Sequence, residues 1–232
     1  MQTMPVLLTR PIADAERMAV RLGARATCIV SPLMRIVFDG ALPVGVGTAL
    51  FTSANGVAAW VAGGGTRGLP AWTVGPRTAE LAREAGFEVR GVAADAAALA
   101  ALIPEDVAAP VHLRGVEQRG DLVARLRRRG IAAGEAVLYR QEPLAPTEAA
   151  RAAVAAGPVL VPLWSPRSAG LLFEAFSQDW RNLRPVCLSP AVAAACPVPV
   201  LAVADRPEGE AMLRAILAKL PARAVEGGAG TV

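Results

Sequence analysis

The residues from 49 to 61 most constrain the fold, because they join a short apolar run to a helix through a hydroxyl-rich corner. Residues 49–51 read as a buried strand, Thr52 and Ser53 end that strand, and residues 55–61 continue with helix-compatible spacing. This order of strand, corner and helix is typical of a parallel α/β sheet. Ser or Thr at such a corner caps the helix, while the first amide N–H groups stay free to bind an anion.

Corners of the same kind occur four more times along the chain, most of them with a Pro close to the corner. In a parallel sheet the carboxyl ends of the strands share one edge, so these corners are expected to gather donors for a ligand. Taken singly, each corner is also explained as an ordinary capped helix start. The four stretches are Leu7-Leu8-Thr9-Arg10-Pro11, Thr73-Val74-Gly75-Pro76-Arg77-Thr78, Pro162-Leu163-Trp164-Ser165-Pro166-Arg167-Ser168 and Val186-Cys187-Leu188-Ser189-Pro190.

The charge of the chain favours a small acidic ligand over nucleic acid. The 232 residues carry a net charge of +4, and every basic residue except Lys219 is arginine. Arginine suits bidentate pairing with carboxylate or phosphate groups. The arginines are scattered, and the cluster at residues 125–129 stands before Gly130, where it complements a helix dipole without interleaved aromatic residues. We therefore expect no nucleic-acid partner.

The cysteines and the single histidine argue against a metal site and a disulfide framework. Cys28, Cys187 and Cys196 are odd in number, form no C-x-x-C motif and stand in apolar stretches, so reduced buried thiols are expected. His112 stands between apolar neighbours in a predicted strand, which is typical of a packed histidine more than of a base. No metal site is predicted.

Two stretches without charged residues, 40–66 and 185–204, do not predict membrane helices. Glycines, polar residues and Pro43 interrupt the first, and four prolines interrupt the second, so neither continues as one apolar helix across a bilayer. The N-terminus lacks the basic start of a signal peptide. These observations predict a cytoplasmic protein that binds no membrane, with a monomer as the default.

The strand and helix order predicts an α/β protein of two lobes, each a parallel sheet flanked by helices, joined by a two-stranded extended connector. Residues 33–39 are extended, and a matching segment at 135–141 comes a hundred residues later, after four strand–helix alternations. A domain inserted between the two is the arrangement that we expect, although the pattern alone also allows one continuous sheet. The predicted limits are 1–31 with 143–221 for domain 1, 42–134 for domain 2, 32–41 and 135–142 for the connector strands, and 222–232 for a flexible tail.

Several of these short stretches, taken in order, resemble the uroporphyrinogen-III synthase family over nearly the whole chain. Each stretch is weak alone, and their order and spacing carry the resemblance. One corner departs from the family pattern, because Ser189-Pro190-Ala191-Val192 lacks a hydroxyl near Val192. The stretches that match are Thr9-Arg10-Pro11, Phe51 to Val57, Val74-Gly75-Pro76-Arg77-Thr78-Ala79, Leu113-Arg114-Gly115 with Arg119, Val137 with Tyr139-Arg140, and Ser165-Pro166 with Ser168.

The resemblance implies a cyclising lyase of tetrapyrrole biosynthesis that needs no cofactor. Its substrate would be hydroxymethylbilane, a linear tetrapyrrole with eight carboxylates, held in a cleft between the lobes. The reaction would remove the terminal hydroxyl, close the ring and invert the last pyrrole to give uroporphyrinogen III. Because the substrate closes unaided to the uninverted isomer, the enzyme would act mainly by orientation. Helix N-termini could hold the carboxylates without strong side-chain bases.

The candidate site residues follow from the corners and from the resemblance. Tyr139, the only tyrosine, stands at the tyrosine position of the family and is the predicted catalytic group, as a hydrogen-bond donor to the departing hydroxyl. It could equally be an amphipathic residue at a domain junction. Arg10 and Arg114 could bind carboxylates or brace their own loops. The predicted substrate-binding residues are Thr9, Arg10, Thr52, Ser53, Asn55, Thr78, Arg114, Ser165, Ser168 and Ser189.

Other functions remain open at this point. A doubly wound fold with Ser and Thr corners could bind a sugar phosphate or a nucleotide. Against this, G-x-x-x-x-G-K-[ST] does not occur, and the G-x-G-x-x-G spacing that begins in the glycine run at Gly63 ends a predicted helix instead of opening one. A two-lobed anion-binding module without catalytic activity is a further alternative, because a fold does not dictate an activity. A DNA-binding regulator is weaker still, since no recognition-helix pattern is present.

Overall fold

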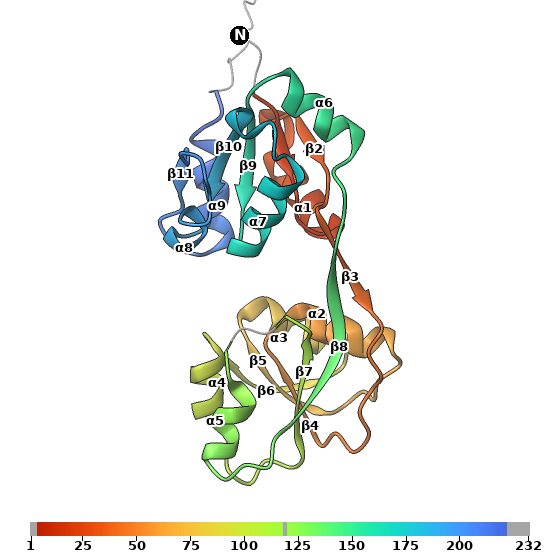
Figure 1. Cartoon of the computed structure of the whole chain (residues 1–232). Coiled ribbons are helices and arrows are strands. Elements are labelled where there is room, and N and C mark those ends of the chain that lie inside the picture. The colour runs from red at the N-terminus through yellow and green to blue at the C-terminus, as the bar shows by residue number, and fades with distance from the viewer. Residues whose placement is uncertain (1–3, 118–119, 222–232) are drawn as a thin grey trace, which may run out of the picture. The chain divides into compact units, whose positions relative to one another are not determined.

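The computed structural model describes residues 4–117 and 120–221, and the chain divides into two compact units (Figure 1). Unit 1 is built from Met1–Arg35 and Pro143–Val232, and unit 2 from Ile36–Glu142. Each unit is an α/β sheet with helices packed on it, which confirms the predicted fold class. The predicted flexible tail at 222–232 lies outside the described residues, as does Arg119 of the family-like stretches.

Unit 1 contains a five-stranded sheet in the order β11-β10-β9-β1-β2, in which every paired neighbour is parallel. The first strand lies inside the sheet, with β2 on one side and β9, from the far end of the chain, on the other. The strands are β1 (Val6–Leu8), β2 (Cys28–Val30), β9 (Val159–Leu163), β10 (Leu183–Cys187) and β11 (Ala202–Val203). The helices are α1 (Ile12–Leu22), α6 (Glu148–Ala156), α7 (Pro166–Ala175), α8 (Pro190–Ala193) and α9 (Gly209–Leu217), with short 3-10 turns at Gly23–Arg25 and Trp180–Asn182.

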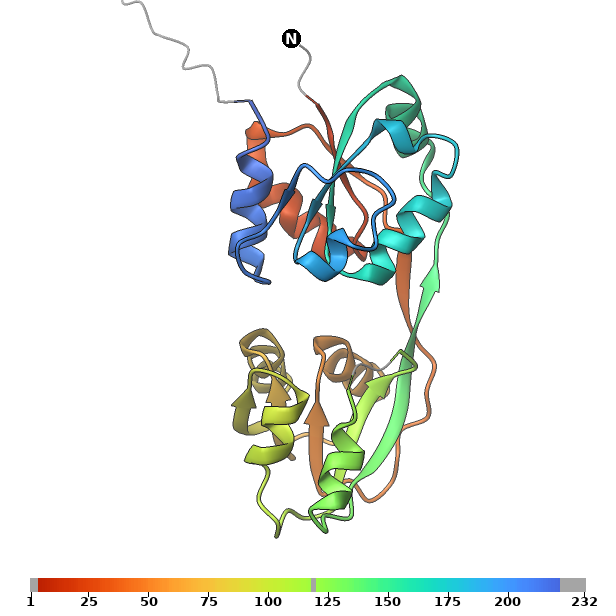
Figure 2. The same cartoon turned by 60° about the vertical axis from the view of Figure 1, so that its left-hand side comes forward.

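Helices cover both faces of the unit 1 sheet (Figure 2). On one face α1 and α9 bring Met18 and Ile216 against Leu160. On the other face α6, α7 and α8 pack against the sheet, where Phe173 lies in the same cluster as Leu163. Because both faces are buried, the central strand β9 is apolar along its whole length and every one of its residues is buried.

Unit 2 contains a six-stranded sheet in the order β3-β8-β7-β4-β5-β6. The pairs from β8 to β6 are parallel, so the carboxyl ends of these strands share one edge. The strands are β3 (Met34–Phe38), β4 (Thr48–Phe51), β5 (Pro70–Val74), β6 (Glu88–Ala93), β7 (Pro110–Gly115) and β8 (Gly134–Pro143). The helices are α2 (Ala54–Ala62), α3 (Pro76–Glu84), α4 (Ala96–Leu102) and α5 (Leu122–Arg128).

The two faces of the unit 2 sheet have different helices. Ala49 and Phe51 of β4 face the layer of α2 and α3, whereas Leu50 between them faces the layer of α4 and α5. This follows from the two-residue period of a strand, which sends successive side chains to opposite faces. Where β4 ends, the same alternation continues into the corner, so Thr52 lies on the α4 and α5 side of the sheet.

The two chain segments that leave and re-enter unit 1 run side by side in opposite directions. The Gly40 N–H donates to the Leu138 carbonyl at 3.2 Å, and the Leu144 N–H donates to the Leu33 carbonyl at 2.9 Å. Arg140 adds an ion pair with Asp39 at 2.7 Å. These contacts add β3 to the edge of the sheet and make it a mixed sheet. The first half of β8 also pairs with β7, so the returning segment is a strand of unit 2 as well as a crossing.

Among the described residues, no helix combines the length and the apolar character that crossing a bilayer requires.

Candidate active site

The corner after β4 begins the site, and its geometry explains its sequence. Ser53 is the N-cap of α2, and its Oγ accepts the Asn55 N–H at 3.2 Å. Gly56 brings the helix close to the neighbouring strand, because a Cβ at that position would lie 2.5 Å from the Leu113 carbonyl oxygen. The helix therefore begins directly against β7, and Thr52 and Ser53 are held at the carboxyl edge of the sheet.

Tyr139 reaches this corner from β8. Its ring lies over Gly115, where an added Cβ would come within 2.5 Å of the ring atom Cε2. The side chain is 6% exposed. Burial raises the pKa of the Tyr139 phenol, and hydrogen bonds with the Ser53 side chain and with the Gly115 backbone offset only part of that rise. The phenol therefore keeps its proton at neutral pH.

Ser53 Oγ accepts the Asn55 N–H and also bonds to the Tyr139 phenol. A serine hydroxyl has one proton and two lone pairs, so Ser53 can donate to Tyr139 while it accepts from Asn55. In that arrangement the Tyr139 O–H can donate to another group. A phenol so placed can act as a neutral hydrogen-bond donor or weak acid.

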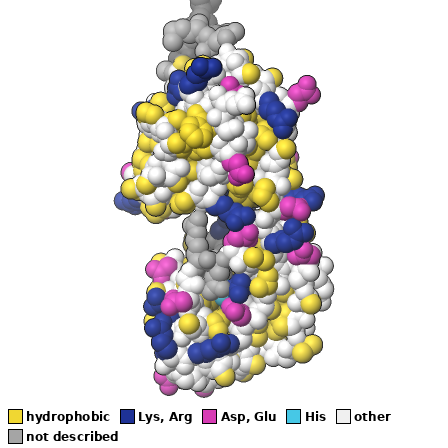
Figure 3. Space-filling model, in the orientation of Figure 1, with side chains coloured by type: hydrophobic (Ala, Val, Ile, Leu, Met, Phe, Trp, Pro, Cys, Tyr) yellow, Lys and Arg dark blue, Asp and Glu magenta, His cyan; other side chains and the backbone are white. Residues whose placement is uncertain are grey.

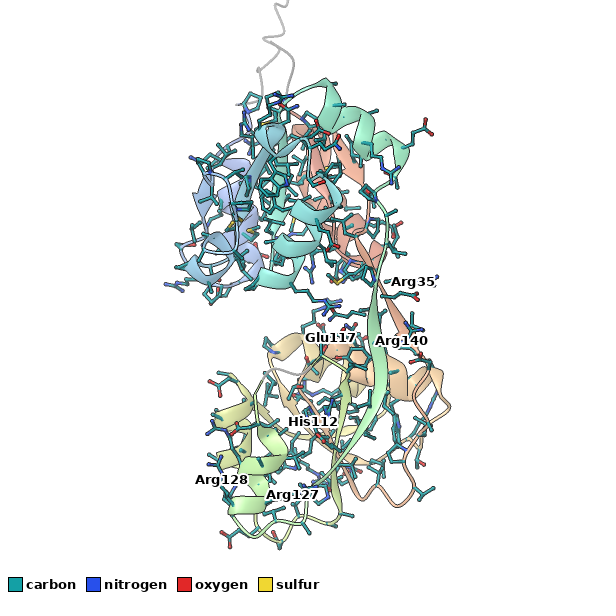
Figure 4. The ribbon with its side chains drawn as sticks, in the orientation of Figure 1. Arg35, His112, Glu117, Arg127, Arg128 and Arg140 are labelled. Carbon is teal, nitrogen blue, oxygen red and sulfur yellow. The ribbon has the colours of Figure 1, made fainter. Side chains whose placement is uncertain are left out.

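His112 of β7 contacts the same corner from the other face of the sheet. Figure 4 labels His112 within unit 2. Its Nε2 lies 2.9 Å from Thr52 Oγ1, and the residue is 1% exposed. Burial and the nearby Arg114 lower the pKa of His112 to about 4, against the opposing effect of Glu135. The ring is therefore neutral at physiological pH, in agreement with the packed histidine predicted from the sequence.

A pocket of about 390 Å³ opens beside Thr52, on the side of α4 and α5. Three charged side chains in its wall are already engaged. Asp95 caps α4 by accepting the Ala98 N–H at 2.8 Å. Asp121 is paired with Arg125, whose hydrogen bond lowers the pKa of the Asp121 carboxyl. The lining residues are Thr52, Val74, Ala94, Asp95, Ala96, Ala97, Gly120, Asp121 and Arg125.

Sequence reasoning missed Asp95, Asp121 and Arg125 as neighbours of Thr52. A signal was present for Asp95, since it precedes the Ala-rich run that forms α4 and Asp is a preferred N-cap residue. The basic cluster was assigned to a helix end, and its side chains do bind locally. Arg128 reaches Asp121 at 3.2 Å and Arg127 reaches the Ala133 carbonyl at 2.9 Å. Figure 3 shows acidic and basic side chains interspersed on this side of unit 2.

Arg114 is bound within its own unit. Its Nε donates to Glu135 at 2.9 Å, and its Nη1 donates to the Gly115 carbonyl at 2.8 Å. Of the two roles considered for Arg114, the described contacts are those of a brace for the end of β7. Arg10 in unit 1 pairs with Asp14 and stacks over the Trp164 ring at 4.4 Å.

The corner after β9 in unit 1 is closed on itself. Ser165 caps α7 by accepting the Ser168 N–H at 3.1 Å, and Ser168 Oγ accepts the Ser165 N–H at 3.0 Å, a reciprocal capping box. Ser168 also donates to the Ser165 carbonyl at 2.8 Å. Both hydroxyls are thus engaged within the corner.

The remaining predicted site residues stand at other corners. Thr9 is buried after β1, and Thr78 is buried in the first turn of α3. Ser189 is the N-cap of α8 without a side-chain hydrogen bond to the helix. The structure thus brings Thr52, Ser53 and Tyr139 together at one corner of unit 2, where Thr52 bonds to His112 and Ser53 bonds to Tyr139. Thr9, Arg10, Ser165, Ser168 and Ser189 belong to corners of unit 1. Their roles toward a substrate stay predictions.

Within residues 4–117 and 120–221, no group of three or more His, Cys, Asp or Glu side chains is placed to hold a metal ion. Cys28, Cys187 and Cys196 are free thiols; Cys187 is buried as predicted, whereas Cys28 and Cys196 are only partly buried. Burial raises the pKa of Cys187 to about 12, so this thiol stays protonated at neutral pH.

Comparison with known proteins agrees with this architecture. A crystal structure of uroporphyrinogen-III synthetase from Helicobacter pylori has a TM-score of 0.67 and 17% identity, over 93% of this chain and 99% of the other. A mutant uroporphyrinogen III synthase from the extremely thermophilic bacterium Thermus thermophilus has a TM-score of 0.53 and 18% identity, over 92% of this chain and 96% of the other. At these identities the likeness establishes the fold. No curated protein sequence matches the chain significantly.

The family model described as "Uroporphyrinogen-III synthase HemD" matches residues 16–214, most of the chain. The match confirms the resemblance that the short stretches indicated, and it does not favour the sugar-phosphate, nucleotide or anion-binding alternatives. The chain therefore belongs to the uroporphyrinogen-III synthase family, the cyclising hydro-lyases of tetrapyrrole biosynthesis.

Proposed function

We propose that this chain closes hydroxymethylbilane into uroporphyrinogen III, and that the corner after β4 is part of its active site. The reaction inverts the terminal pyrrole ring and releases one water molecule. Family membership supports the reaction. One structural observation supports the site, namely that neighbouring strands hold both corner hydroxyls, Thr52 by His112 and Ser53 by Tyr139.

Tyr139 acts on the leaving group in this proposal. The terminal hydroxyl of the substrate must depart as water, so its oxygen has to gain a proton. A phenol that stays neutral and whose oxygen is held by Ser53 and Gly115 can donate a hydrogen bond to that oxygen. The rest of the catalytic effect comes from holding the chain of pyrroles so that only the inverted closure is reached.

Thr52 and Asn55 contribute to binding the carboxylates. Thr52 has a hydroxyl at the wall of the pocket, and Asn55 stands in the first turn of α2, where the helix dipole favours an anion. A substrate with many carboxylates can be held by several such neutral donors. Binding by neutral donors does not require charged basic side chains, and weaker contacts of this kind also allow the product to be released.

The test of the function uses hydroxymethylbilane generated in place by the preceding enzyme of the pathway. The wild-type chain is expected to give mainly the type III product. Formation of type I product alone would refute the proposed function.

Tyr139→Phe tests the role of the phenol. This variant is expected to keep its fold and to lower the rate of type III formation at saturating substrate by roughly tenfold or more, because one proton donor is lost. A wild-type rate in Tyr139→Phe would remove Tyr139 from the mechanism.

We also propose the predicted setting of the enzyme. It works as a monomer in the cytoplasm, without a nucleic-acid or membrane partner and without a cofactor. The local pairing of the α5 arginines with Asp121 and with backbone carbonyls supports the absence of a nucleic-acid surface there. Residues 32–41 and 135–142 are proposed as the connector between domain 1 (1–31 and 143–221) and domain 2 (42–134), supported by the hydrogen bonds between the two crossings.

A further inference from the structure

His112 is unusual in unit 2, because its ring is buried and only one of its two nitrogens has a hydrogen-bond partner. Its Nε2 contacts Thr52 at 2.9 Å, while Nδ1 is buried without a hydrogen-bond partner. A buried polar atom without a partner costs free energy, so a structure that retains one needs a reason for the polar ring. An apolar side chain would fill the same space on β7 at lower cost.

The unbonded Nδ1 indicates which nitrogen of His112 carries the proton. With the proton on Nδ1, the ring would bury an N–H without an acceptor, which is rare in proteins. With the proton on Nε2, the N–H is used on Thr52, and Nδ1 keeps only a bare lone pair. The Nε2–H tautomer is therefore favoured, and the hydroxyl oxygen of Thr52 is the acceptor in this bond.

This direction of the bond decides what Thr52 can do. Because Thr52 accepts from His112, its own proton is not used by the ring and is left to donate. Thr52 lines the pocket beside α4 and α5, so a ligand in that pocket meets a hydroxyl that is fixed in position and able to donate. A carboxylate is an acceptor only, which makes it the matching partner.

The charges around the ring agree with a fixed and neutral role. Arg114 and Glu135 are the charged groups that act on His112, and they are paired with each other at 2.9 Å. Burial further holds the ring in its neutral form. His112 therefore does not exchange protons with the substrate and can keep one tautomer throughout the reaction.

We propose that His112 is a positioning residue, which holds the Thr52 hydroxyl by an Nε2–H hydrogen bond so that Thr52 donates to a carboxylate of the substrate. The proposal rests on the proposed function, since it assigns a role toward the same polycarboxylate. It also explains the corner sequence, because a threonine held on one side and a serine held on the other place two hydroxyls at one strand end.

The test compares His112→Leu, His112→Gln and Thr52→Val in the full chain, with hydroxymethylbilane generated in place. Leucine fills the space without a donor, whereas the glutamine amide can still donate to Thr52. We expect KM to rise about tenfold in His112→Leu and in Thr52→Val, the loss of one hydrogen bond to a charged group. His112→Gln should stay within about twofold of the wild type, and the double variant His112→Leu with Thr52→Val should be no worse than either single variant.

The outcomes separate this inference from the proposed function. Failure of the wild type to form type III product refutes the function itself. If the wild type forms it and His112→Leu keeps the wild-type KM, the positioning role is refuted. Additive effects in the double variant would also refute it, because they would mean that the two residues act independently. Should His112→Leu not fold, Thr52→Val decides, because a wild-type KM in that variant would mean that the Thr52 hydroxyl holds no carboxylate and that His112 has nothing to position.

Discussion

The corner after β4 and the corner after β9 have nearly the same sequence order, yet they use their hydroxyls differently. In the first, Ser53 and Thr52 bond to Tyr139 and His112, which come from other strands of the sheet. In the second, Ser165 and Ser168 bond only to each other and to the backbone of their own turn. This difference in hydrogen-bond partners is the reason for proposing the corner after β4, and not the corner after β9, as part of the active site.

The largest expected effect concerns pH, because only the corner after β4 is linked to a buried histidine. The pKa of His112 falls from 6.5 to about 4 on folding. Its contribution to stability is therefore complete above pH 6.5 and is lost as the pH falls toward 4, by about 3 kcal/mol in all. Urea unfolding at pH 7 and pH 4 should show this loss in the wild type and not in His112→Gln.

Ser165→Ala is the control for this pH experiment, since it changes the other corner and keeps the histidine. It should lose the same stability between pH 7 and pH 4 as the wild type. If the free energy of unfolding of the wild type and of His112→Gln changed equally between pH 7 and pH 4, the buried neutral ring of His112 would be contradicted. The two corners would then not differ in their effect on the pH dependence of stability.

The next effect tests the packing of Tyr139. Gly115→Ala places a methyl group 2.5 Å from Cε2 of the ring and 2.7 Å from Cζ, so either the ring or the strand must move. We expect the free energy of unfolding to fall by about 1–3 kcal/mol, and the type III rate to fall because the phenol leaves Ser53. Chemical denaturation and the product assay measure the two effects.

The matched variant is Gly170→Ala in α7, where an added Cβ meets no atom within 4 Å. It is expected to gain about 0.5–1 kcal/mol, as alanine does over glycine within a helix. If Gly115→Ala behaves like Gly170→Ala in stability and rate, the ring of Tyr139 is not held where the structure places it.

The smallest expected effect concerns the corner after β9, whose hydroxyls are used within their own turn. Ser165→Ala removes the cap of α7 and should lower the free energy of unfolding by about 1 kcal/mol. Because the Ser165 hydroxyl is used within its own turn, KM for hydroxymethylbilane should change by less than about twofold. A clear rise in KM would instead return Ser165 to the substrate-binding residues that its sequence predicts.

Much of the fold was predictable from the sequence because it depends on local patterns. Thr52 ends the apolar run of β4 directly after Phe51, and a single apolar residue separates Ser165 and Ser189 from the ends of β9 and β10, respectively. Extended segments a hundred residues apart predicted that the chain leaves one unit and returns to it. What the pattern could not give is that β8 also pairs with β7, since strand pairing depends on contacts distant in the sequence.

The site was predictable only in part, for the same reason. Thr52, Ser53 and Tyr139 were candidates because of the corner and of the family resemblance. The contact of His112 with Thr52 follows from the parallel register of β4 and β7, in which Leu50 pairs with His112. Nothing near either residue in the sequence specifies that register. The charged pocket residues were missed because β7 separates α4 from α5 in the sequence, so that their proximity depends on how both helices pack on the sheet.

The nested order of the units has a consequence for synthesis on the ribosome. Unit 2 is one continuous stretch, Ile36–Glu142, and can fold as soon as that stretch has emerged. The inner strand β1 pairs with β9 through Val6 and Leu160. Strand β1 therefore cannot complete its pairing until β9 has been synthesised. Unit 1 closes this long loop at an entropic cost that grows only slowly with loop length, and a prefolded unit 2 shortens the effective span. Unit 2 is therefore expected to fold first, and once folded to bring the two segments of unit 1 together.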